Sequence, residues 1–118
     1  GFAQYSEWMW SEEEGLGTAQ EQFDAVYNGI PATDPFWSVV IGDPGPQLLF
    51  DNAVYFRGAM AVHALRLEVG DRDFFRILRA WTTRKAGGNV VSTDGEGFSA
   101  VVMAFRSKTG VSWSNCMA

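Results

Sequence analysis

The clearest helical pattern in this chain is DNAVYFRGAMAVHALR, at residues 51–66. Its apolar side chains recur at spacings of three and four, which predicts one continuous stripe along a helix. The stripe consists of Val54, Gly58, Ala61, Val62 and Leu65. Tyr55 lies one position off this stripe. A tyrosine at the border of a buried face either packs against a core or points into a cleft, and the pattern leaves both alternatives open.

Two helices are predicted before this stretch. Residues 1–14 place four large apolar side chains on one helical face, namely Phe2, Tyr5, Trp8 and Met9. In the second helix, at residues 18–28, Thr18 and Glu21 have the spacing of a capping box. We expect the buried side of this second helix to consist of Phe23, Val26 and Tyr27.

A further helix is predicted at residues 71–85, with Asp71 as its N-cap. Residues 29–47 contain all four prolines and therefore form a stiff loop, in which PFWSVVI (35–41) is either an extended piece or a plug over the core. Near the C-terminus, residues 98–105 fit a helix, and SAVVMAF (99–105) fits a strand equally well. The fold class that follows is mostly α, with four or five packed helices.

Composition limits the classes of function. A chain of 118 residues forms one domain at most, and a net charge of −5 argues against a nucleic-acid surface. The single cysteine, Cys116, excludes an internal disulfide and a cysteine-based zinc site within one chain. No apolar run reaches the length of a membrane span, so no membrane partner is expected. Five Trp and nine Phe indicate that part of the surface is meant to be covered.

Two segments resemble the aminopeptidase N family of zinc metallopeptidases, in its gluzincin catalytic domain. The segment that follows the family's third zinc ligand is matched by Gly1, Phe2, Ala3, Tyr5, Glu7 and Trp8. The family's helix Y-x-x-G-A-x-x-L-H-x-L is matched by Tyr55, Gly58, Ala59, His63 and Leu65, with Val62 in place of the first leucine. Residues 70–81 also match its pattern G-D-x-x-F-x-x-x-L-R-x-W. The resemblance covers residues 1–90, and residues 91–118 are a poorly matched tail.

The resemblance implies a function. The chain looks like a single fragment, at residues 1–118, of the helical subdomain of a thermolysin-like catalytic domain. The intact enzyme would hydrolyse N-terminal residues from peptides, with zinc held by two His and one Glu and with water in the fourth position. The resemblance assigns Tyr55 the catalytic role of donating a hydrogen bond to the oxyanion of the tetrahedral intermediate. Phe56 and Arg57 depart from the family, which leaves the substrate preference open.

The resemblance also implies what this fragment lacks. No H-E-x-x-H occurs in it, and the glutamate ligand would immediately precede Gly1. We therefore expect no metal ligand, no bound zinc and no activity in this chain alone. Glu7 is either a carboxylate that orients a zinc-bound imidazole or an exposed acid. The lone histidine, His63, is expected to be structural, that is, packed or hydrogen-bonded.

A second class of function remains open. The chain could instead be a non-catalytic helical protein-interaction module that is derived from the same family. In either case, helices that have lost their neighbours would expose apolar surface, so we expect the isolated fragment to form a homo-oligomer. Peptide substrate is the only other partner that the resemblance implies.

Overall fold

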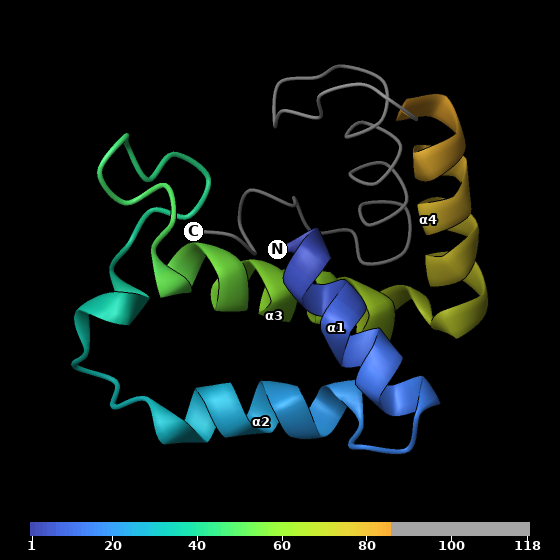
Figure 1. Cartoon of the computed structure of the whole chain (residues 1–118), viewed down its shortest axis with the longest axis horizontal. Coiled ribbons are helices and arrows are strands. Elements are labelled where there is room, and N and C mark those ends of the chain that lie inside the picture. Colours follow the sequence, from blue (N-terminus) through green and yellow to red (C-terminus); the bar gives the residue numbers. More distant parts are fainter. Residues whose placement is uncertain (86–118) are drawn as a thin grey trace. The chain divides into compact units, whose positions relative to one another are not determined.

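The computed structural model describes the backbone of residues 1–85 and the side chains of residues 1–80 (Figure 1). The described residues form helices α1 (Phe2–Glu13), α2 (Ala19–Gly29), α3 (Asn52–Val69) and α4 (Asp71–Lys85), with a 3₁₀ turn, η1, at Pro35–Trp37. They contain no strand, and the prediction of a mostly α fold is confirmed. The segment predicted as a helix or a strand, residues 99–105, lies outside the described residues.

The chain divides into two compact units. The first is Gly1–Ala64 and the second begins at Leu65, within α3. The predicted fragment, residues 1–118, with its matched part at 1–90 and its tail at 91–118, remains a prediction.

The first helix forms as the sequence predicts. Tyr5 and Trp8 are buried, and Phe2 and Met9 are half-buried on the same side. No side chain caps the start of α1 at Gly1. The helix ends before Gly15, whose φ of +70° suits a residue without a Cβ.

The capping box of α2 is confirmed. The Glu21 backbone N–H donates to the Thr18 hydroxyl oxygen at 3.1 Å, and the Thr18 N–H donates to Glu21 Oε2 at 2.7 Å. The prediction of its buried side was wrong for Tyr27, which is 60% exposed, whereas Phe23 and Val26 are half-buried and Ala19 is the buried residue of α2. Tyr27 still makes ring contacts, stacked on Phe23 at 6.2 Å between centroids, but the rest of its surface faces solvent.

In the proline-rich loop, the structure distinguishes between the two alternatives predicted for PFWSVVI, an extended piece and a plug over the core. Pro35–Trp37 forms a 3₁₀ turn, so the extended alternative is wrong for this part. The turn is capped by Asp34, whose Oδ1 accepts the Phe36 backbone N–H at 2.9 Å. Phe36 is buried while Val40 is exposed, so one ring rather than the whole run acts as the plug.

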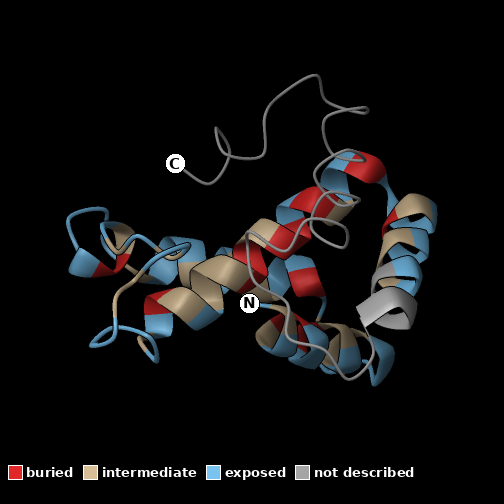
Figure 2. Cartoon of the chain, turned by 90° about the horizontal axis from the view of Figure 1, so that it is seen from above, coloured by how far each residue is buried: buried red, intermediate tan, exposed pale blue. Residues whose placement is uncertain are grey.

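The central helix α3 is buried over a wider arc than the predicted stripe. It begins at Asn52, where Asp51 Oδ1 accepts the Ala53 N–H at 2.8 Å, and it ends before Gly70, whose φ is +82°. The buried positions are spread along its whole length (Figure 2): Ala53, Ala59, Met60, Val62, His63, Leu65 and Val69. Of the stripe, only Val62 and Leu65 are buried, so packing extends to faces that the pattern did not mark.

The predicted N-cap of α4 was wrong. The helix already includes Asp71, and Gly70 takes the cap position, with its carbonyl accepting the Phe74 N–H at 2.9 Å. The Asp71 carboxylate instead pairs with the Arg66 guanidinium, at 2.9 and 3.2 Å. Arg66 also lies over the Phe75 ring, 5.3 Å from its centroid. The arginine therefore orients the carboxylate away from a capping role.

Candidate functional site

Tyr55, the predicted catalytic residue, lies in the first turn of α3. Its side chain is 36% exposed. Within the described part of the chain, no residue hydrogen-bonds to its hydroxyl group. The phenol is thus a border residue whose O–H can donate to a ligand, which is the chemistry that oxyanion stabilisation requires.

The start of α1 lies against α3 one turn beyond Tyr55 (Figure 1). The contact is between the backbones of Gly1 and Gly58, because a Cβ placed on Gly58 would be only 2.7 Å from Gly1 Cα. No side chain separates the two helices there. Residues three apart share one side of a helix, so Tyr55 and Gly58 are neighbours on the surface that meets α1.

Partial desolvation of the N-terminal amino group has an electrostatic consequence. The amino group of Gly1 is partly desolvated, and this desolvation lowers the pKa of the ammonium below its ordinary value. The close helix contact therefore favours a neutral group at this point.

A hydrogen-bonded chain that is buried at Tyr5 and His63 joins three helices beside this contact. Tyr5 and His63 are both buried, and the Tyr5 hydroxyl lies 3.0 Å from His63 Nδ1. His63 Nε2 lies 3.1 Å from Gln20 Oε1. A carbonyl oxygen only accepts, so Nε2 carries the proton and Nδ1 accepts the Tyr5 O–H. His63 is packed and hydrogen-bonded, as the sequence predicted.

Ring contacts extend this chain across the first unit. His63 lies between the Tyr5 and Phe23 rings, with centroids 5.7 Å away on either side. Among the described residues, the ring contacts run in the order Trp8, Tyr5, His63, Phe23, Tyr27, Trp37 and Phe36. Aromatic pairs at such separations add stability beyond the area they bury. Much of the aromatic surplus in the sequence thus serves to connect α1, α2, α3 and the loop.

Glu7 is exposed on α1. Its Oε2 accepts a hydrogen bond from Gln4 Nε2 at 2.8 Å. Across the side chains that the structure describes, no hydrogen bond joins Glu7 to Tyr55. The two predicted site residues are therefore not brought together directly.

The described residues do not form a zinc site. Among them, no group of three His, Cys, Asp or Glu side chains is placed to hold a metal ion. A zinc ion at this site would need ligands from outside the described part of the chain. None of the described helices is long and apolar enough to cross a membrane.

Sequence reasoning missed two residues that shape the site. Arg57 was noted only as a departure from the family, yet its guanidinium donates to the carbonyl of Val39 at 2.6 Å and to that of Phe36 at 3.4 Å. It thereby fastens the proline-rich loop to α3. Gln20 was not marked at all, and no local signal reveals that it bonds to His63, which lies 43 residues further along the chain.

Comparisons with known proteins give no relative. No protein-family model, curated protein or solved structure matches the chain.

Proposed function

We propose that this chain is part of a zinc-dependent aminopeptidase and that Tyr55 is its oxyanion-stabilising residue. In this proposal the phenol donates its O–H to the carbonyl oxygen of the scissile bond as negative charge develops there. Such a donor acts mainly in the transition state, so its contribution appears in kcat more than in KM. The chain also supplies one wall of the cleft.

The observation that carries the proposal is the contact between the two motif segments. Gly1 and Tyr5 belong to the first motif, and Gly58 and His63 to the second. The glycines meet backbone to backbone, and Tyr5 hydrogen-bonds to His63. Residues that match one family in two distant segments are thus direct neighbours, as expected if the segments form one catalytic wall.

The described residues do not provide the metal. The proposal therefore requires the zinc ligands to be supplied by sequence joined to Gly1, and it predicts that the 118-residue chain is inactive alone. It requires an H-E-x-x-H motif in the coding sequence upstream of Gly1. A glutamate must follow that motif at the family's spacing and be joined directly to Gly1. A start codon near Gly1 without that motif would reject the proposal.

The catalytic role has its own test in the longer protein. Hydrolysis of an aminoacyl-nitroanilide is measured for the parent and for Tyr55→Phe. The substitution should lower kcat about 10²- to 10³-fold with little change in KM. Tyr27→Phe, an exposed tyrosine on α2, is the matched control and should leave both constants unchanged. Equal activity of the parent and Tyr55→Phe would refute the assigned role.

An alternative function is a non-catalytic interaction module. It is favoured by apolar side chains that the loop leaves exposed, which are Val40, Leu48, Leu49 and Phe50. Phe50 is 79% exposed, and exposed apolar patches often mark interaction surfaces. Both functions predict self-association of the isolated chain, which analytical ultracentrifugation over a range of concentrations tests. Because this result does not distinguish the two functions, sequencing of the region upstream of Gly1 is needed to separate them.

A further inference from the structure

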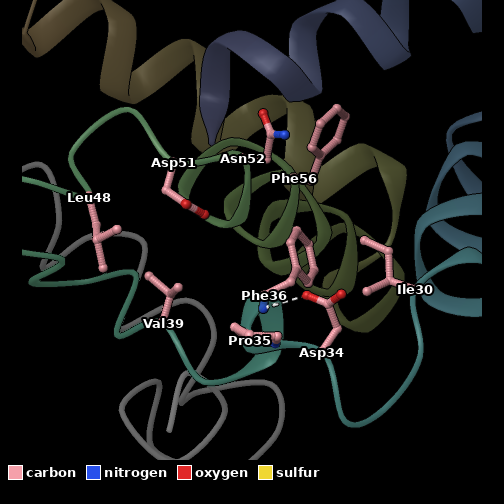
Figure 3. Close-up of a pocket in the computed structure, with 9 residues that line it drawn as sticks. All are labelled: Ile30, Asp34, Pro35, Phe36, Val39, Leu48, Asp51, Asn52 and Phe56. Carbon is pink, nitrogen blue, oxygen red and sulfur yellow. Dashed lines mark hydrogen bonds between the residues drawn. The ribbon is translucent and has the colours of Figure 1, made fainter.

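A pocket of about 490 Å³ lies between the proline-rich loop and the first turns of α3 (Figure 3). Its volume falls within the range of small-ligand sites. All its lining residues belong to the first unit. Most of the walls are apolar and include Ile30, Phe36 and Leu48.

Two carboxylates enter the pocket from different elements. Asp34 belongs to the proline-rich loop, and Asp51 is the residue immediately before α3 (Figure 3). Each uses Oδ1 to accept a backbone N–H, Asp34 from Phe36 at 2.9 Å and Asp51 from Ala53 at 2.8 Å. These bonds orient the side chains before any ligand arrives. In the described part of the chain, no cation pairs with either carboxylate.

The pocket is also held in shape. Pro35 fixes the backbone φ of the turn that carries Phe36. Arg57, on α3, donates to the carbonyls of Phe36 and Val39, so both sides of the pocket are tied together. Its guanidinium is occupied by these carbonyls, and the lining itself contains acids but no base. A pocket of fixed shape, with apolar walls and negative charge, fits a ligand with an apolar stem and a cationic end.

We propose that this pocket binds the lysine side chain of a peptide. The four methylene groups of lysine would lie along the apolar walls, and the ammonium group would donate to the free oxygen of Asp34 or Asp51. This inference goes beyond the aminopeptidase proposal and does not depend on it, because the pocket is formed entirely by residues of this chain.

The test compares two peptides that differ only in the charged group. Acetyl-Ala-Lys-Ala-amide and acetyl-Ala-norleucine-Ala-amide are titrated separately into the 118-residue chain, and NMR shifts of the Phe36 amide and the Asn52 side chain are followed. The lysine peptide should bind about fivefold more tightly, which is the effect of one ion pair that remains partly in contact with solvent. High salt should reduce this ratio.

Variants assign the effect to the carboxylates. In the double variant Asp34→Asn, Asp51→Asn, the amide oxygens can still accept the two backbone N–H groups, so the caps are kept while the charges are lost. The double variant should bind both peptides equally. Asp43→Asn removes one charge from the same loop without touching the pocket lining, and it should keep the preference for lysine. Equal binding of the two peptides by the parent chain, no binding, or shifts elsewhere would overturn the proposal.

Discussion

Replacing Gly58 with alanine would put a methyl group where α3 meets the start of α1. That carbon would lie 2.7 Å from Gly1 Cα and 3.2 Å from Gly1 N. Both neighbours are backbone atoms, which cannot turn aside as a side chain can. The first turn of α1 must therefore shift or unwind.

Two effects of opposite sign determine how much Gly58→Ala changes the free energy of unfolding. In a helix interior, alanine is better than glycine by about 1 kcal/mol. Forcing an extra carbon into a close-packed contact costs about 1–3 kcal/mol. We therefore expect Gly58→Ala to lower the free energy of unfolding by about 1 kcal/mol, although helix propensity alone predicts a gain of that size.

The assay is urea unfolding followed by circular dichroism, with Gly29→Ala as the control. Gly29 ends α2, its φ is ordinary, and a Cβ there would meet nothing within 4 Å. The control should be neutral or stabilised by up to about 1 kcal/mol. If Gly58→Ala is stabilised as much as Gly29→Ala, the backbone contact between α1 and α3 is refuted.

Three further predictions concern α2, the buried hydrogen bond and the N-terminus. Thr18→Ala removes the capping box and should cost about 1 kcal/mol in the free energy of unfolding, measured in urea; no loss would contradict the cap. Tyr5→Phe removes the hydroxyl donor to His63 Nδ1 and should lower the free energy of unfolding by about 1–2 kcal/mol. The control Tyr27→Phe should change the stability little, and equal effects of the two substitutions would argue against the buried bond. The Gly1 amine, titrated by NMR, should show a lower pKa in the folded chain than in the urea-unfolded chain, because burial penalises the ammonium. The folded state then binds fewer protons than the unfolded state. The free energy of unfolding therefore increases as pH rises from the folded pKa of this amine to about 8, and it decreases as pH falls through the same range. A folded pKa at or above the unfolded pKa would contradict this prediction.

The features that the sequence predicted correctly are local ones. The Thr18 capping box depends on two residues three positions apart, so the pattern contains all that determines it. The same holds for the helical spacing of α1 and α3. Tyr55 was expected at the border of a buried face, and its exposure of 36% agrees with that position.

The errors arise where a distant or competing partner decides the outcome. Asp71 has the chemistry of an N-cap, but Arg66 binds its carboxylate. Tyr27 was expected in the core, yet the loop residue Trp37 meets its ring edge to face at 6.0 Å and the remaining surface stays in solvent. The loop anchor Arg57 depends on carbonyls 18 and 21 residues away, and no spacing rule marks such a bond.

His63 is the only histidine in the chain, and it lies where α1, α2 and α3 are joined by hydrogen bonds. The protein therefore contains a natural spectroscopic probe at the junction of its first three helices. One pair of imidazole resonances, free of overlap from other histidines, would report whether the three helices are assembled. Loss of α1 from the bundle would change the Nδ1 signal first, and loss of α2 would change the Nε2 signal, so the order of disassembly could be followed without adding a label.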